Sequence, residues 1–221
     1  KVDIVAITQP KIGNDKGNIM TPGEFIAYCA RVSNPTNQMN TLTAPKLLKY
    51  CAKHKHWSVF EMVNIIMCIE TTRDIARQIL RHRSFSFQEF SQRYADPTKL
   101  GFVTRETRLQ DTKNRQNSIE TNDDQLKKYW DWKQKQIIHE TGLAYNWAIE
   151  NGIAKEQARA ILPKGLINSR MYMNGNLRSW IHYCHLRMGV ETQKEHREIA
   201  SSCWYEILRE FPELKNISIA E

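Results

Sequence analysis

The fold is decided by residues 63–94, VNIIMCIETTRDIARQILRHRSFSFQEFSQRY. Residues 63–71 form a nearly continuous apolar run, whose Ile and Val content is typical of a strand buried on both faces of a sheet. From Asp74, a residue type that favours helix starts, apolar residues recur at helical spacing through Ile79 and on to His82. We therefore expect a buried strand and an amphipathic helix that together hold a polar segment rigidly.

A strand and two helices are predicted before this stretch. Residues 2–8 have the composition of a short strand, and the Gly, Asn and Lys residues that follow are typical of a turn. Thr21 supplies a helix cap, Pro22 occupies the first helical position, and Glu24 lies three residues after the cap. Residues 43–53 repeat this pattern, again with a capping threonine and an early proline.

More helices are predicted after it. Residues 101–122 are polar and charged, which indicates strand ends and a mobile loop. Apolar residues then recur every three to four positions in several segments, and these end near Gly152, Pro163 and Pro212. The segments are 123–150 (one long helix or two joined helices), 154–162, 176–188 and 195–211.

These elements predict one α+β domain over residues 1–221. We expect a central, mostly antiparallel sheet with helices packed against it. The long helix 123–150 is expected to reach outward, toward other subunits.

Composition limits the class of protein. The chain has 221 residues, of which 41% are hydrophobic and 25% charged, as in a globular protein. No apolar run is long enough for a membrane helix, so no membrane association is expected. The five cysteines are odd in number and widely spaced, which argues against a disulfide framework and favours a reducing cytoplasm.

The net charge of +8 indicates an anionic partner. Two kinds of partner remain open at this point. A nucleic acid would need a continuous basic surface, whereas a nucleotide would need a few arginines that converge on one pocket. The arginines occur in short blocks separated by apolar runs, which favours the pocket.

The densest chemical signal is the segment 81–94, which contains three arginines, a histidine, a carboxylate and three serines. Neighbouring arginines repel unless an anion lies between them, and the planar guanidinium suits phosphates and uracil carbonyls. The alternative is a solvated helix end with salt bridges to Glu89 and Asp96, since helix C-termini favour cations in any case.

This segment resembles the signature of the flavin-dependent thymidylate synthases, in which Arg-His-Arg is followed after seven residues by Ser. Further blocks of the chain are similar to other elements of that family, in the same order, so that the resemblance extends from about residue 30 to residue 197. The blocks are 30-ARVS-33, 56-HWSVFE-61, 81-RHR-83 with Ser91, 158-ARAILP-163, 176-NLRS-179 and 186-LR-187.

The resemblance implies the α+β fold of that family and reductive methylation of dUMP to dTMP, with FAD as cofactor. NADPH would reduce the flavin, and methylenetetrahydrofolate would donate the carbon and leave as tetrahydrofolate. It implies contacts to dUMP from Gln78, Ile79, Leu80, Arg81, Glu89, Phe90, Ser91, Gln92, Arg93, Arg159 and Arg187. It implies contacts to FAD from Ser33, His56, Ser58, Arg81, His82, Arg83, Glu89, Asn176, Leu177, Arg178 and His182.

The resemblance also implies a homotetramer in which subunits share active sites. Two departures from the family pattern concern the substrate loop. Gln88 stands where Asn is common, and Gln92 stands where a smaller residue is common. Neither removes a charge, but either could alter the loop near the substrate phosphate.

Arg187 and Ser91 are the candidate catalytic residues. Methylation at a uracil carbon needs a cation to stabilise negative charge on the ring, and Arg187 ends an amphipathic helix that could fix its direction. It could also be an ordinary surface arginine. Ser91 has no surrounding nucleophile motif, so we expect it to bind the nucleotide rather than to attack it. Because the flavin supplies the hydride, no cysteine nucleophile is expected.

Other roles remain open. No metal site is predicted, because the histidine pairs 54/56 and 182/185 lack a completing carboxylate. Trp130, Trp132 and Trp147 favour core or subunit packing over base stacking. Two alternative functions remain: a nucleic-acid-binding module, and a flavin enzyme that transfers a group to a different substrate. We expect no nucleic acid as a partner.

Overall fold

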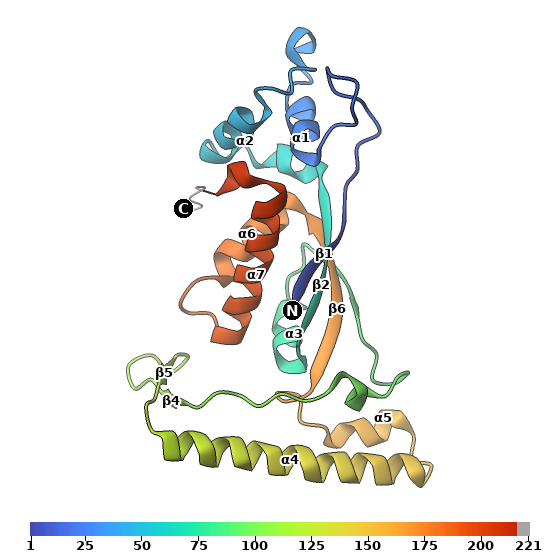
Figure 1. The fold of residues 1–221 in the computed structure, drawn as a ribbon, viewed down its shortest axis with the longest axis vertical. Helices are drawn as coiled ribbons and strands as arrows, with labels where there is room; N and C mark the ends of the chain where they lie inside the picture. The colour runs from blue at the N-terminus through green and yellow to red at the C-terminus, as the bar shows by residue number, and fades with distance from the viewer. Residues whose placement is uncertain (216–221) are drawn as a thin grey trace.

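A four-stranded antiparallel sheet forms the centre of the molecule (Figure 1). The computed structural model describes residues 1–215. The strand order is β1-β2-β6-β3, and every neighbouring pair is antiparallel, which confirms the predicted sheet. The strands are β1 (Val2–Ile7), β2 (Asn64–Thr72), β6 (Asn168–Asn176) and β3 (Ser86–Glu89).

The prediction that β2 is buried on both faces is wrong for the single chain. Ile65, Met67 and Ile69 are fully buried on one face. Cys68 and Glu70, on the other face, are only partly covered. The apolar run is continuous in sequence, but alternate side chains of a strand point to opposite faces, and in this chain helices cover only one of them.

Helices pack on the buried face of the sheet. In Figure 1, α6 and α7 lie side by side along the sheet, and α1 and α2 lie at its upper end. Trp180 of α6 is completely buried, and its indole Nε1 donates a hydrogen bond to the carbonyl of Ile65, 3.0 Å away. The helices are α1 (Pro22–Ala30), α2 (Ala44–Lys53), α3 (Arg73–Ile79), α6 (Leu177–Arg187) and α7 (Lys194–Glu210).

The remaining elements are short, apart from one long helix. Residues 101–122, where strand ends and a mobile loop are predicted, contain the small hairpin β4 (Arg108–Gln110) and β5 (Ser118–Glu120). The predicted helix 154–162 is divided into α5 (Lys155–Ala158) and the 3-10 turn η4 (Arg159–Ile161). Further 3-10 turns are η1 (Pro35–Asn37), η2 (Trp57–Met62), η3 (Pro97–Leu100) and η5 (Pro212–Leu214).

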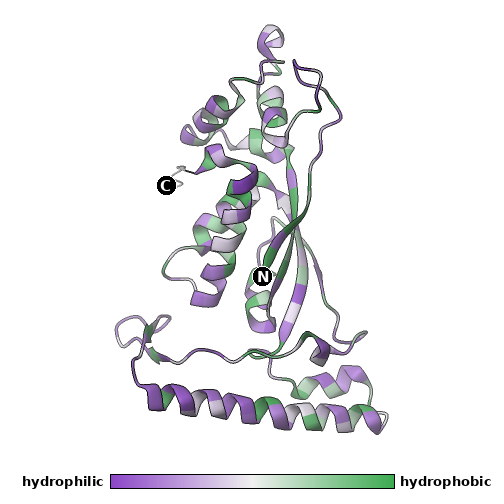
Figure 2. Cartoon of the chain, viewed as in Figure 1, coloured by the Kyte–Doolittle hydropathy of each residue, from purple (hydrophilic) through white to green (hydrophobic). Residues whose placement is uncertain are grey.

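The stretch predicted as one long helix or two joined helices is one continuous helix, α4 (Asp124–Glu150), which crosses the lower end of the molecule (Figure 1). Asp123 caps it by accepting a hydrogen bond from the backbone N–H of Leu126. Polar and apolar residues are interspersed along its length (Figure 2). Its three tryptophans are 43%, 47% and 61% exposed, so they do not pack in a core of the single chain. Packing against another subunit therefore remains a prediction for them.

Helix starts follow the sequence with two exceptions. Thr21 and Glu24 form the predicted capping box of α1. Thr43 does not cap α2 with its side chain, because its hydroxyl accepts a hydrogen bond from Arg31 instead. In α3 the cap residue is Thr72, and Asp74 lies in the first turn. Since α3 already ends at Ile79, His82 lies outside the helix in which its spacing placed it.

Among residues 1–215, no helix combines the length and apolar character required to cross a bilayer.

Gly175 of β6 allows an aromatic ring to lie directly on the sheet. A Cβ atom at this position would come within 2.4 Å of the Phe85 ring, much closer than real contacts allow. Replacing Gly175 with alanine should therefore displace Phe85 and lower the free energy of unfolding by about 1–3 kcal/mol. Urea unfolding measures this change.

Gly142 provides the control, because nothing lies within 4 Å of a Cβ atom added there. It is inside α4, where alanine is favoured over glycine by about 0.5–1 kcal/mol. The Gly142→Ala variant should therefore be slightly more stable. A Gly175→Ala variant as stable as the parent would contradict the close packing of Phe85.

Candidate active site

Three of the predicted ligand-binding residues meet where α3, α6 and α7 come together. The Nε atom of Arg187, the last residue of α6, donates a hydrogen bond to Nε2 of His82, 2.9 Å away. Gln78, near the end of α3, contacts two residues at the start of α7: Gln193 at 2.8 Å and His196 at 3.3 Å. We call Gln78, His82 and Arg187 the α6 group.

His82 is held in its neutral form. Burial, together with the nearby positive charge of Arg187, lowers its pKa from 6.5 to about 4. Because Nε2 accepts the hydrogen bond from Arg187, the remaining ring proton must lie on Nδ1. The geometry thus excludes His82 as a proton donor through Nε2 and makes it a fixed acceptor that aims the guanidinium.

His196 and Tyr183 complete this region, and no motif or spacing in the sequence selects either of them. His196 is 1% exposed, and its Nε2 lies 3.1 Å from the hydroxyl of Tyr183. Burial, then the charge of Arg187, lowers the pKa of His196 to about 4. Helical spacing alone presents His196 as one more residue of an amphipathic helix.

The two depressed pKa values predict acid sensitivity. Well above pH 6.5 both histidines are neutral in the folded and unfolded states, so their protonation does not make stability depend on pH. Between pH 6.5 and about 4 the unfolded chain binds protons that the folded chain does not, and stability falls as pH falls. Each histidine contributes up to about 1.4 kcal/mol per pH unit in this window.

Urea unfolding between pH 7 and 5 measures this loss. A His196→Phe variant should lose stability less steeply, since one of the two titrating groups is gone, whereas His139→Phe on the exposed surface of α4 should not alter the slope. Equal slopes for all three proteins would refute the depressed pKa of His196.

A second set of predicted residues lies in another part of the chain. Ser91 and Arg93 line a cavity of about 450 Å³ together with residues of α5. The Arg93 guanidinium is exposed and forms an ion pair with Glu156 at 3.1 Å. Arg159 follows in the next turn, and its Nε donates to the carbonyl of Glu156. We call Ser91, Arg93 and Arg159 the α5 group.

Within residues 1–215, no hydrogen bond or ion pair joins the α6 group to the α5 group. The cavity that Ser91 and Arg93 line includes no residue of the α6 group.

Glu89 occupies a largely covered position at the end of β3. Its carboxylate forms an ion pair with Arg73 at 3.3 Å and accepts a hydrogen bond from Ser169 at 2.9 Å. The side chains of Glu89 and Arg73 are only 14% and 8% exposed. Sequence reasoning did not select Arg73, which lies at the first position of α3 and has no motif of its own.

A cavity of about 530 Å³ contains two of the residues predicted to contact FAD, Arg178 and His182. Lys55 and Trp57 also line it and lie next to two further predicted contacts, His56 and Ser58. Cationic groups beside an aromatic ring fit the phosphates and rings of a dinucleotide. Arg178 is paired with Glu61 in this chain.

The other predicted contacts are placed as follows. Ser33, Arg81 and Arg83 are exposed, and Leu80 and Phe90 are partly buried. Ile79 and Leu177 are fully buried in the core and Gln92 is 5% exposed, so ligand contacts from the first two would have to come from the backbone. Asn176 caps α6 by accepting a hydrogen bond from the backbone N–H of Ser179.

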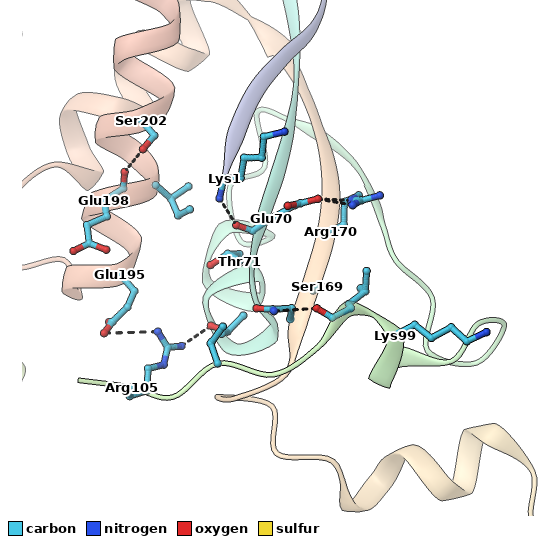
Figure 3. Close-up of a pocket in the computed structure, with 15 residues that line it drawn as sticks. Lys1, Glu70, Thr71, Lys99, Arg105, Ser169, Arg170, Glu195, Glu198 and Ser202 are labelled. Carbon is cyan, nitrogen blue, oxygen red and sulfur yellow. Dashed lines mark hydrogen bonds and ion pairs between the residues drawn. The ribbon is translucent and has the colours of Figure 1, made fainter. Parts of the chain in front are cut away.

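A cavity of about 620 Å³ lies between α7 and the end of the sheet (Figure 3). It contains none of the residues predicted to bind ligands. Its walls carry the ion pairs Arg170 with Glu70 and Arg105 with Glu195, so its charges are largely compensated within the chain. Size alone therefore does not make it the candidate active site.

The fold agrees with that of a nucleotide methylase. A crystal structure of the UMP/dUMP methylase PolB from Streptomyces cacaoi, bound with 5-Br UMP, matches with a TM-score of 0.74. The match has 21% sequence identity and covers 96% of this chain and 90% of the other. A second structure of PolB, bound with 5-Br dUMP, matches with a TM-score of 0.73.

Sequence comparisons define the family. The model of the thymidylate synthase complementing protein family matches residues 18–213. A flavin-dependent thymidylate synthase from Synechocystis sp. is 47% identical over 96% of this chain and 95% of its own length. A probable flavin-dependent thymidylate synthase from Paramecium bursaria Chlorella virus 1 is 45% identical with the same coverage. The chain belongs to the family of flavin-dependent thymidylate synthases.

Proposed function

We propose that this chain converts dUMP to dTMP by reductive methylation. Methylenetetrahydrofolate donates the one-carbon unit and leaves as tetrahydrofolate, and NADPH supplies the hydride and leaves as NADP⁺. The observation that carries this assignment is the hydrogen bond from Arg187 to a neutral His82, next to Gln78, in a chain of this family. This hydrogen bond directs a guanidinium beside Gln78, another residue that the sequence analysis assigns to dUMP.

FAD is the cofactor of this enzyme. When bound, it accepts the hydride from NADPH and passes it on, which the protein side chains cannot do themselves. We assign the binding of FAD to the cavity around Arg178 and His182, together with Ser33, His56, Ser58 and the segment 81–83. Lys55, which the sequence analysis did not select, adds a positive charge to this cavity.

The two groups bind different parts of dUMP. In the α6 group, Arg187 stabilises negative charge on the pyrimidine, because His82 occupies its Nε and leaves the Nη groups to face a ligand. In the α5 group, Ser91, Arg93 and Arg159 bind the phosphate. Phosphate binding would require Arg93 to exchange Glu156 for the ligand, which is feasible since that ion pair is solvent-exposed.

The division also supports a shared site. We propose that the α6 group of one subunit faces the α5 group of another within a homotetramer. Mixing Arg187→Ala protein with Arg93→Ala protein under conditions that allow subunit exchange should then restore activity, because some sites combine two intact halves. No recovery, despite demonstrated exchange, would place both groups in one subunit.

The proposal includes one domain over residues 1–221 and a cytoplasmic location. Cys51, Cys184 and Cys203 are buried and unpaired, and burial raises the pKa of each thiol, so they remain unreactive. Such thiols are typical of proteins that work in a reducing compartment.

One incubation tests the function. The protein is mixed with FAD, NADPH, dUMP and methylenetetrahydrofolate, and the products are separated. We expect dTMP and tetrahydrofolate in equal amounts. Dihydrofolate in place of tetrahydrofolate would mean that the folate donated the hydride. Flavin reduction without any dTMP would favour a different acceptor substrate, and failure to bind FAD would refute the assignment.

A further inference from the structure

We propose that His196 is a positioning residue that locks the side-chain amide of Gln78 in one orientation, so that the enzyme distinguishes uracil from cytosine. The proposal rests on the proposed function, because it concerns the same nucleotide site. Its basis is a series of side-chain hydrogen bonds in which Gln78 is bonded through both its NH₂ group and its oxygen.

This series of hydrogen bonds runs from Glu195 to Tyr183. Gln193 Nε2 donates to Glu195 Oε2 at 2.8 Å, and Gln78 Nε2 donates to Gln193 Oε1 at 2.8 Å. On the other side of Gln78, its Oε1 lies 3.3 Å from His196 Nδ1, and His196 Nε2 lies 3.1 Å from the Tyr183 hydroxyl. Five side chains are thus linked in series.

The carboxylate of Glu195 sets the direction of the whole series. It can only accept hydrogen bonds, so Gln193 must turn its NH₂ group toward Glu195 and its oxygen toward Gln78. Gln78 must then present its NH₂ group to Gln193, which leaves its oxygen for His196. Each amide has one orientation that satisfies both neighbours.

Glu195 is itself fixed and ionised. It pairs with Arg108. It also pairs with Arg105 at 3.7 Å, as Figure 3 shows. Burial alone would raise the pKa of Glu195, but hydrogen bonds from its own backbone and from Gln193, with the charges of the two arginines, bring the pKa below its ordinary value. Arg105 is held in turn by Asp74, Thr72 and the carbonyl of Gly165.

The same reasoning fixes the proton of His196. Gln78 offers an oxygen to Nδ1, so Nδ1 must carry the hydrogen, and Nε2 must accept from the Tyr183 hydroxyl. The ring is almost completely buried, and the ring of Tyr183, equally buried, lies 5.8 Å from it between centroids. A buried, neutral imidazole with one assigned tautomer is a rigid support for an amide.

The locked amide has a consequence for base recognition. One N–H and one oxygen lone pair of Gln78 remain available to a ligand. The pairing edge of uracil offers an N–H beside a carbonyl oxygen, whereas that of cytosine offers a ring nitrogen acceptor beside an NH₂ group. An amide that can turn over matches either edge, but a fixed amide matches only one.

The first test is independent of catalysis. Nitrogen-15 NMR of the FAD-loaded, histidine-labelled enzyme reports which ring nitrogen of His196 carries the proton, and the His196→Asn variant assigns the signal. We expect the proton on Nδ1. A proton on Nε2 would overturn the proposal, whatever the activity of the enzyme.

The second test measures specificity. The inhibition constant of dCMP is divided by the KM of dUMP for the parent and for His196→Phe, His196→Asn and Gln193→Leu. We expect this ratio to fall about tenfold in His196→Phe and in Gln193→Leu. It should stay near the parental value in His196→Asn, whose amide can still donate from the position of Nδ1. Turnover at saturating dUMP should change little in all three.

Control variants distinguish failure of this proposal from misfolding of a variant and from failure of the proposed function. His139→Phe, on the exposed surface of α4, should leave both constants unchanged. Gln193 is exposed, so its leucine variant should fold even if His196→Phe does not. An unchanged ratio in Gln193→Leu would overturn the proposal. A parent enzyme that makes no dTMP would instead refute the proposed function, and the NMR result would still decide whether the amide is locked.

Discussion

Replacing Arg187 with alanine should lower kcat/KM for dUMP about a hundred- to a thousandfold, which is the effect expected when a directed charge is removed from a developing anion. His82 aims the guanidinium by accepting a hydrogen bond from its Nε, and α6 fixes the helix end from which it projects. The kcat/KM of Arg187→Lys should lie between those of the parent and the alanine variant. Lysine keeps the positive charge, but its single ammonium group cannot hold His82 and face the ligand in the fixed geometry of a guanidinium. Steady-state rates of dTMP formation measure both effects.

Two variants define the specificity of this result. Ser91→Ala should retain measurable turnover, since Ser91 is expected to bind the phosphate and not to form a covalent bond. Arg209→Ala, which breaks only an exposed ion pair on α7, should behave as the parent. If Ser91→Ala lost all activity while still binding dUMP, or if Arg187→Ala kept a tenth or more of its activity, the assigned roles would have to be exchanged.

Removing Arg73 should produce the largest loss of stability. Arg73 and Glu89 form a buried ion pair, and the Nη1 atom of Arg73 also donates to the carbonyl of Phe90. In Arg73→Met the carboxylate of Glu89 would keep only the hydroxyl of Ser169 as a partner. An unpaired buried charge costs about 3–5 kcal/mol, which urea unfolding at a fixed protein concentration would detect.

The double variant shows whether the charge is the cause. Adding Glu89→Leu to Arg73→Met removes the unpaired carboxylate and should recover most of the lost stability. Activity should not recover, because Glu89 belongs to the predicted dUMP and FAD contacts. A double variant as unstable as the single one would show that Arg73 stabilises the chain through Phe90 or through packing instead.

The sequence predicted most helices and missed half of the sheet. Helix signals are local, so the capping box at Thr21 and the long spacing pattern of α4 identified both elements. In β6 the sequence NSRMYMNGN mixes polar residues with two methionines and a glycine, and it acquires strand geometry only by pairing with β2. β3 has four residues inside a polar motif and depends on β6 in the same way. Strand pairing is a long-range property that no local pattern contains.

In the candidate site too, long-range contacts could not be predicted from local sequence. Arg187 and His82 could be selected by chemistry and by resemblance, and the structure brings them together. His196, Tyr183 and Arg73 could not, because their role comes from burial next to residues far away in the sequence. The family motif could not show that the nucleotide contacts form two groups. A motif identifies residues expected to bind the ligand, but it does not say how far apart they lie in the folded chain.

The central pair of strands also sets the order of events during synthesis. β2 ends at residue 72 and pairs with a strand that begins at residue 168. A ribosome adds roughly 5–20 residues per second, so the interval between the two strands takes on the order of 5–20 s. During that time one edge of β2 can pair with β1, but the backbone N–H and C=O groups along its other edge have no strand partner until β6 is made. The nascent chain is therefore most exposed to aggregation, and most dependent on chaperones, while α4 is being made.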